Sequence, residues 1–231
     1  MEIYPAGDCA LCVEFGETIA PEINDRVHAL AESLRLRPIP GVRDMAPAYA
    51  SLLVCFDPLR VSSRRLAARL KNRAAKTGGA FSGGGNTVRI PVCYEGDFAP
   101  DMEAVSRYTG FSPAELIARH TKPEYRIYML GFLPGFPYLG GLDPALETPR
   151  LAAPRTRIPA GSVGIGGAQT GIYPLESPGG WRLIGRTPVK VYDPRRAEPF
   201  MYRTGDTIVF YPVSPAEYEA LVRGGETGGE R

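Results

Sequence analysis

Apolar residues in the first 80 positions occur partly as short runs and partly at helical spacing, which predicts strands alternating with helices. Residues 9–15 form an apolar run closed by Gly16, as in a strand. A helix is expected after Pro21, because proline suits the first turn of a helix. Beyond it, apolar side chains recur at helical spacing at Ile23, Val27, Leu30, Ala31 and Leu34.

The elements that follow resemble most of a ferredoxin-like unit. Residues 42–49 and 52–56 predict two strands, and a second helix begins at Ser62 or Ser63, either of which can cap it. The run at 88–93 either completes a βαββαβ order or opens a second domain. We assign an α+β, ferredoxin-like N-terminal domain to residues 1–85.

Glycines at 77–85 indicate a linker between domains. A phosphate-binding loop is excluded there, because no Gly-Lys-Ser/Thr follows and no helix begins. Residues 86–215 are assigned to a mostly-β domain and residues 216–231 to a partly disordered C-terminal segment.

The second domain begins with two short helices and continues as short strands. Residues 101–108 end before Gly110, and Ser112 with Glu115 has the spacing of a capping box. Regularly spaced β-rich runs then predict a barrel or sandwich: residues 125–130, 181–184, 189–192 and 207–211.

Residues 131–188 are unusually dense in glycine and proline. They hold 12 glycines and 9 prolines, too many for core strands, together with several aromatic residues that disorder would leave solvated. We therefore interpret this segment as ordered loops whose backbone is pressed close to another group.

Composition excludes several classes of partner. The 231 residues have a net charge of +2, which gives no broad field for nucleic acid or an anionic membrane. No membrane-spanning run or leader is visible, so we expect a cytoplasmic protein. The four cysteines suit a reducing compartment, and Cys9 with Cys12 lacks the second close pair that zinc requires, so we predict no metal site.

Nucleophilic serine catalysis is a weak interpretation of Ser162. The stretch at 160–164 resembles a nucleophile elbow, but both histidines, His28 and His120, precede Ser162 in the chain. We expect His28 on the polar side of its helix. His120 either lies at the mouth of the Gly/Pro-dense segment and titrates near neutral pH, or stabilises the end of its helix.

Four arginines enter or leave the Gly/Pro-dense segment and could bind a carboxylate or phosphate through their guanidinium forks. They are Arg155, Arg157, Arg182 and Arg186. With glycine amides and nearby polar side chains, they could form a pocket for a planar amide or carboxylated ligand.

Five motifs in the same segment resemble one family. They occupy residues 131–138, 157–164, 169–174, 177–181 and 185–188. The chain is similar over nearly its whole length to the carboxyltransferase-domain family that includes the B-type subunit of bacterial 5-oxoprolinase. This family has also been called allophanate hydrolase subunit 1 and includes a Kip-type inhibitor of a sporulation histidine kinase.

The resemblance implies a cyclophilin-like β-barrel and a heteromeric enzyme. It implies a homologous second subunit and a third subunit, which together open 5-oxoproline to glutamate with ATP. Because no Gly-Lys motif for ATP is visible, nucleotide is expected to be bound by, or shared with, a partner. Inhibition of a histidine kinase, or a role in urea or allophanate metabolism, are the alternatives.

The resemblance also implies a set of ligand-facing residues. We expect His120 to transfer protons, Arg157 to bind a carboxylate or phosphoryl group, and Gln169 to polarise a lactam carbonyl. The expected substrate-binding residues are Gly135, Phe136, Ser162, Thr170, Tyr173, Ser177, Pro178, Gly179, Gly180 and Trp181.

Overall fold

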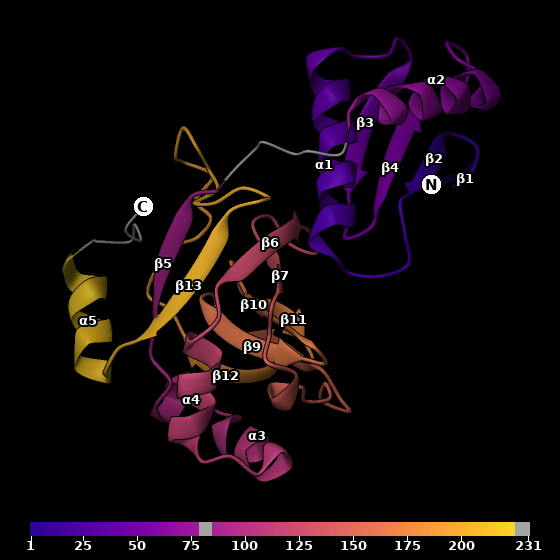
Figure 1. The fold of residues 1–231 in the computed structure, drawn as a ribbon. Helices are drawn as coiled ribbons and strands as arrows, with labels where there is room; N and C mark the ends of the chain where they lie inside the picture. The colour runs from indigo at the N-terminus through magenta and orange to yellow at the C-terminus, as the bar shows by residue number, and fades with distance from the viewer. Residues whose placement is uncertain (79–84, 225–231) are drawn as a thin grey trace. The chain divides into compact units, whose positions relative to one another are not determined.

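A computed structural model describes residues 1–78 and 85–224. Contacts divide the chain into two compact units, Met1–Gly83 and Gly84–Arg231 (Figure 1). Most of the predicted linker and the predicted disordered tail, at 79–84 and 225–231, lie outside the described residues.

The first unit is an antiparallel sheet with two helices packed on it. The strands run in the order β1-β2-β4-β3. Helix α1 contacts β3 and β4, and α2 contacts β1 and β2. The elements are β1 (Glu2–Pro5), β2 (Ala10–Glu14), α1 (Pro21–Leu36), β3 (Val42–Pro47), β4 (Ser51–Phe56) and α2 (Ser63–Lys76).

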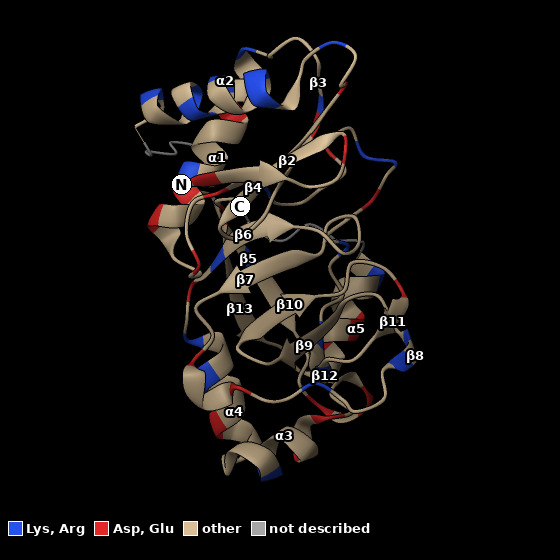
Figure 2. Cartoon of the chain, turned by 90° about the vertical axis from the view of Figure 1, so that its right-hand side faces the viewer, with Lys and Arg blue, Asp and Glu red and all other residues tan. Residues whose placement is uncertain are grey.

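Both predicted helices of this unit are confirmed. Pro21 occupies the first turn of α1, and the Ser62 side chain caps α2 by accepting a hydrogen bond from the Arg65 amide. Helix α2 buries Leu66 and Leu70 and carries several Lys and Arg residues, seen as blue segments in Figure 2.

Two predictions for this unit need correction. His28, expected at the surface of α1, is only 5% exposed and belongs to the buried side of the helix. The ferredoxin-like βαββαβ order is not confirmed, because the run at 88–93 lies in β5 (Thr87–Val92), a strand of the second unit. Its side chains Val88 and Ile90 are buried in that unit's core.

The second unit is a seven-stranded sheet that nearly closes into a barrel. Its order is β12-β9-β10-β7-β6-β13-β5, and a bridge between Cys93 and Arg186 joins the two ends. The mostly-β class predicted for this part is therefore confirmed. The strands are β5, β6 (Tyr125–Leu130), β7 (Pro137–Gly140), β9 (Ser162–Gly166), β10 (Gln169–Ile172), β12 (Arg182–Arg186) and β13 (Thr207–Pro212).

A separate two-stranded ribbon and several short helices complete the unit. The ribbon pairs β8 (Arg155–Ile158) with β11 (Ser177–Gly179). The helices are η1 (Gly96–Phe98), α3 (Met102–Thr109), α4 (Pro113–Thr121), η2 (Pro144–Leu146) and α5 (Pro215–Gly224). Helix α5 occupies the first part of the segment expected to be partly disordered. Within the described residues, no helix combines the length and apolar character needed to cross a bilayer.

The capping residues predicted for the two helices α3 and α4 are confirmed. Gly110 ends α3 with a left-handed φ of 79°. Ser112 and Glu115 form the predicted capping box at the start of α4. Gly110 therefore fixes the end of α3, and Ser112 fixes the start of α4.

The prediction that residues 131–188 are loops is wrong over much of the segment. Strands β7 to β11 fall within it, because glycines in this segment leave the backbone bare for aromatic rings to pack against. Strand β12 also lies within it, and it confirms the β-rich run predicted at 181–184. The predicted strand at 189–192 is also wrong. It makes only an isolated bridge between Tyr192 and Phe200, although Val189 and Val191 are buried.

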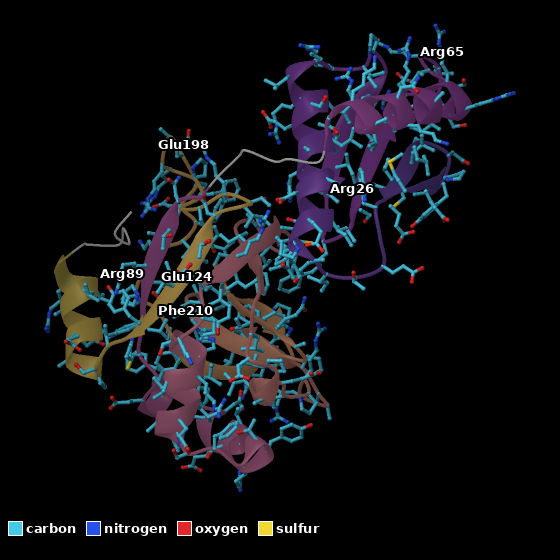
Figure 3. The ribbon with its side chains drawn as sticks, viewed as in Figure 1. Arg26, Arg65, Arg89, Glu124, Glu198 and Phe210 are labelled. Carbon is cyan, nitrogen blue, oxygen red and sulfur yellow. The ribbon has the colours of Figure 1, made fainter. Side chains whose placement is uncertain are left out.

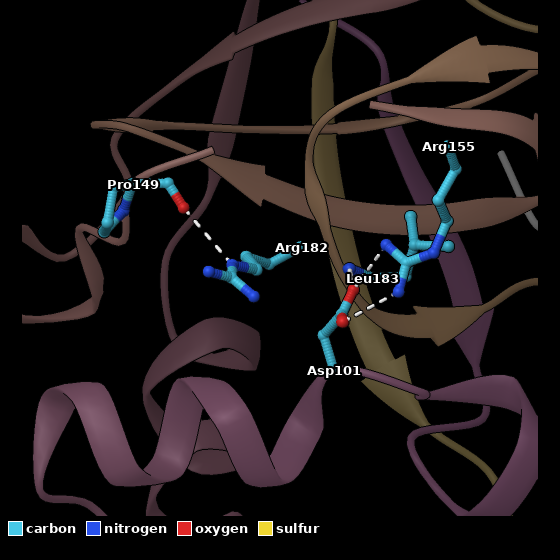
Figure 4. Close-up of polar contacts among 5 residues, drawn as sticks. All are labelled: Asp101, Pro149, Arg155, Arg182 and Leu183. Atoms are coloured by element: carbon cyan, nitrogen blue, oxygen red, sulfur yellow. Dashed lines mark hydrogen bonds and ion pairs between the residues drawn. The ribbon is translucent and has the colours of Figure 1, made fainter. Parts of the chain in front are cut away.

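Asp101 ties three elements together at the base of the barrel (Figure 4). Its carboxylate accepts two hydrogen bonds from the Arg155 guanidinium, at 2.9 and 2.8 Å, and one from the Leu183 amide at 2.7 Å. Asp101 precedes α3, Arg155 begins β8 and Leu183 lies in β12. The interaction therefore holds the ribbon against the barrel.

We predict that Asp101→Ala lowers the free energy of unfolding by about 3 kcal/mol, because it leaves a half-buried guanidinium and a buried amide without their acceptor. Urea unfolding measures this change. Glu198→Ala, which breaks the exposed ion pair with Arg203, is the control and should cost less than about 0.5 kcal/mol. Equal effects of the two substitutions would contradict the role assigned to Asp101.

Candidate functional site

The residues predicted to face a ligand separate into three neighbourhoods of the second unit. His120 and Thr170 lie in a buried polar network, Phe136, Tyr173 and Trp181 in an aromatic cluster, and Arg157 on the exposed ribbon. The structure therefore separates residues that the sequence analysis assigned to one ligand-binding set.

His120 lies inside the barrel. Its side chain is fully buried and stacks on Phe210 of β13, labelled in Figure 3, with ring centroids 4.9 Å apart. Nδ1 is 2.8 Å from the Tyr94 hydroxyl, and Nε2 is 2.9 Å from Thr170 Oγ1. The prediction that His120 lies at the mouth of the segment is wrong.

The hydrogen bonds of Thr170 fix the tautomer of His120. Thr170 donates its one hydroxyl proton to the Gly164 carbonyl oxygen at 3.0 Å, so its oxygen must accept from His120. His120 therefore carries its proton on Nε2, and Nδ1 accepts from Tyr94. The arrangement connects α4 to β10 through neutral groups only.

Burial lowers the pKa of His120 from its usual 6.5 to about 3. The expectation that this residue titrates near neutral pH is therefore wrong. With both ring nitrogens hydrogen-bonded inside the core, His120 serves to hold the structure.

The aromatic cluster packs on the face of β9 and β10 that carries Gly164, Gly166 and Gly171, opposite the side chains that these strands bury in the main core. It consists of Phe136, Ile158, Tyr173, Trp181 and Leu183, with the three rings between 2 and 5% exposed. Phe136 contacts Tyr173 and Trp181 edge to face, with centroids 5.3 and 5.4 Å apart. These rings pack on one another as core side chains.

Glycines let the cluster lie directly on the backbone. A Cβ on Gly166 would come within 2.6 Å of the Trp181 indole, and a Cβ on Gly179 within 2.6 Å of the Tyr173 hydroxyl. One on Gly171 would lie 2.9 Å from the Pro137 carbonyl oxygen. The glycines expected to donate amides to a ligand are therefore also required for packing.

Arg157 is the most accessible of the predicted catalytic residues. Its side chain is 76% exposed and pairs through Nε with Glu176 at 2.7 Å. An exposed ion pair contributes little to stability, so a competing carboxylate can replace Glu176 at small cost. Arg157 can thus bind an anion without disturbing the fold.

The other three arginines are engaged elsewhere. Arg155 is bound to Asp101, and Arg182 donates to the Pro149 carbonyl oxygen at 3.3 Å. The Arg186 guanidinium lies 5.6 Å from the centre of the Phe98 ring. Arg157 is therefore the one of the four best placed to meet a ligand.

Gln169 and Arg157 lie near opposite ends of the aromatic cluster. Gln169 begins β10, opposite Gly166, whereas the ribbon contacts Tyr173, just beyond the end of β10, through Gly179. Four residues of strand span about 13 Å. The structure does not bring Gln169, Arg157 and His120 to one point.

The remaining predicted binding residues are mostly buried. Ser162 and Ser177 are 1 and 7% exposed, and Ser162 pairs with Arg186 in the barrel. Gly179 lies on the Tyr173 ring, and Pro178 and Gly180 are more accessible. Gly135 has a left-handed φ of 81° in the turn before Phe136. No group of three potential metal-binding side chains occurs among residues 1–78 and 85–224.

A cavity beside α4 lies away from the aromatic cluster. It has a volume of about 680 Å³ and is formed by α4 together with residues 141–144. Arg119 and Asp143 both line it and pair at 2.7 Å. Hydrogen bonds from the Ala145 amide and then from the Arg119 guanidinium lower the pKa of Asp143. No pattern in the sequence pointed to this cavity.

Residues 1–202 match the family model of the carboxyltransferase domain, subdomain C and D, so the chain belongs to this family. It is 42% identical to the B-type subunit of 5-oxoprolinase from Bacillus subtilis over 229 residues, covering 95% of each chain. It is 39% identical to the corresponding 5-oxoprolinase subunit from Escherichia coli O157:H7, covering 90% of this chain and 94% of that one.

A solved structure shows a similar fold. The crystal structure of TTHA0988 matches with a TM-score of 0.77 and 44% identity over 89% of this chain. The match spans only 40% of the TTHA0988 chain, so the same fold occurs there within a longer polypeptide.

We predict that protonation of His120 in the unfolded chain destabilises the protein in mild acid. The folded pKa is about 3 and the usual value 6.5, so the unfolded state binds more protons between these values. This residue's contribution should make the protein about 2 kcal/mol less stable at pH 5 than at pH 7.

The measurement is urea unfolding of wild type and His120→Gln at both pH values. Glutamine can keep both hydrogen bonds but cannot be protonated in this range, so the variant should lose that part of the pH dependence. Parallel pH profiles for the two proteins would contradict the prediction.

Proposed function

We propose that this chain is a subunit of an ATP-dependent 5-oxoprolinase that converts 5-oxoproline to glutamate. The observation that supports this most strongly is the 42% identity to a 5-oxoprolinase subunit over 95% of both chains. Similarity extends over both units rather than over one motif, which favours a shared role over a shared fold alone.

The proposal includes partners, because the family description covers subdomains C and D of a larger domain. A homologous carboxyltransferase-type subunit and a third subunit would supply the remainder of the enzyme. The packing of the aromatic cluster supports this, since the three predicted ligand-facing rings are covered by their own chain. We assign the second unit to the cyclophilin-like barrels and the complex to the cytoplasm as part of the same proposal.

Arg157 is proposed to bind the carboxylate of 5-oxoproline. Its guanidinium is exposed, held by one replaceable partner, and carried on a ribbon fixed by Asp101. Gln169 lies at the opposite end of the cluster, about 13 Å from Tyr173 along β10, so it is not assigned to the same substrate molecule. Polarisation of the lactam carbonyl and proton transfer are left to groups of the partners.

ATP is proposed to bind mainly on a partner subunit. The four arginines of the Gly/Pro-dense segment are engaged by Asp101, Glu176, a carbonyl oxygen and an aromatic ring. A triphosphate needs several unoccupied hydrogen-bond donors close together. The four arginines do not provide such a set on this chain alone. When bound, ATP would supply the driving force for opening the lactam.

The decisive experiment reconstitutes this chain with its two candidate partner subunits and measures ATP-dependent glutamate release from 5-oxoproline. We expect turnover by the full assembly and little or none by this chain alone. Turnover of allophanate instead, or no turnover of either compound by a stable assembly, would overturn the proposal.

Within that assembly, Arg157→Ala should reduce kcat/KM for 5-oxoproline about 100-fold, equivalent to about 2.7 kcal/mol of lost transition-state binding. Arg195→Ala is the matched control, because Arg195 is 80% exposed and also pairs with a carboxylate, Asp193. Activity of Arg157→Ala within twofold of that control would remove Arg157 from the site.

A further inference from the structure

Three exposed apolar side chains surround the turn between β6 and β7. Phe132, Phe200 and Leu175 are 60, 39 and 37% exposed. A Cβ on Gly135 in this turn would lie 3.4 Å from the Phe200 ring and 3.7 Å from Pro174, which precedes Leu175. We call Phe132, Leu175 and Phe200 the turn patch.

The backbone of the turn presents the Phe132 ring outward. The Leu133 amide donates to the Gly131 carbonyl oxygen at 2.7 Å, which closes a γ-turn around Phe132. Phe132 has a φ of 63° and is the one non-glycine residue with positive φ among those the structure describes. This strained conformation holds a large apolar ring that its own chain leaves mostly uncovered.

The rest of the turn is built to hold this conformation. The Phe136 amide donates to the Leu133 carbonyl oxygen at 3.0 Å across Pro134 and Gly135, the residue types that a type II turn prefers. The Phe132 ring meets Phe136 edge-on, with centroids 5.5 Å apart. The exposed ring is therefore supported from beneath by the aromatic cluster.

Polar pairs flank the apolar centre. Glu176, next to Leu175 in the chain, pairs with Arg157, and Glu198, close to Phe200 in sequence, pairs with Arg203. An apolar centre beside exposed charges is the composition of a protein–protein interface. Isolated exposed apolar residues are ordinary, but a group around one turn indicates a binding surface.

We propose that the turn patch is the docking surface for the homologous polypeptide that supplies the rest of the carboxyltransferase domain. Two observations favour this occupant: the family description covers only subdomains C and D, and TTHA0988 has the same fold within a chain of which it is 40%. The identity of the occupant rests on the proposed function. A partner seated here would also meet Arg157 at the edge of the patch.

The test uses isothermal titration calorimetry to measure binding of this chain to the purified homologous carboxyltransferase-type subunit. Phe132→Asn removes the ring, and asparagine tolerates positive φ, so the variant should bind about tenfold or more weakly while its melting temperature stays the same or rises. Phe200→Ser, with no positive φ at its position, should also weaken binding. Tyr108→Ser, which removes a 62% exposed ring from α3, is the control and should bind like wild type.

Wild-type affinity in both Phe132→Asn and Phe200→Ser would overturn the proposal. So would self-association of this chain alone, detected by analytical ultracentrifugation and lost in Phe132→Asn, because a second copy would then be the occupant. No binding of the wild-type chain to the homologous subunit would overturn it as well. A complex that forms through the patch but releases no glutamate with all subunits present would leave the docking surface standing and reject the proposed function.

Discussion

Direct packing of aromatic rings on bare backbone is the constraint on which the second unit depends. Trp181 lies against Gly166, and Tyr173 lies against Gly179, at distances that leave no room for a Cβ. Interiors this closely packed respond to the addition of a single methyl group. The density of glycine in the segment is therefore explained by contact with rings of the same chain.

This packing determines which residues remain open to other molecules. Because these rings are buried against the sheet, the accessible groups of this region lie on its surface, above all Arg157 on the ribbon and Phe132 at the β6–β7 turn. Asp101 fixes the ribbon from one side, and the hydrogen bonds of His120 fix α4 to β10 from within. A rigid surface of this kind suits assembly with a partner that completes a site.

Sequence alone predicted the elements with strong local signals. The capping box at Ser112 and the helix after Pro21 are local features, and the structure contains both. The strand at 88–93 was recognised, but its place depends on pairing with β13, more than 100 residues later, which no local pattern reveals. Glycine-rich barrel strands were interpreted as loops because strand propensity ignores what packs on the backbone.

The candidate site was only partly predictable for the same reason. The motifs drew attention to Trp181, Tyr173 and Arg157, but side-chain chemistry does not show whether a group faces a ligand or the core. His120 illustrates this, since its expected titration depended on exposure, and the fold buries it completely. No sequence pattern distinguished Phe132 from other aromatic residues of the segment, because its importance comes from one backbone angle.

The most direct test of this account is the effect of a methyl group on Gly166. Trp181 is the one tryptophan of the chain, so its fluorescence reports on the cluster alone. Gly166→Ala should cost about 1–3 kcal/mol of stability and change the emission of Trp181, whereas Gly180→Ala, whose added Cβ meets nothing closer than 3.7 Å, should do neither. Wild-type stability and emission in Gly166→Ala would contradict the account.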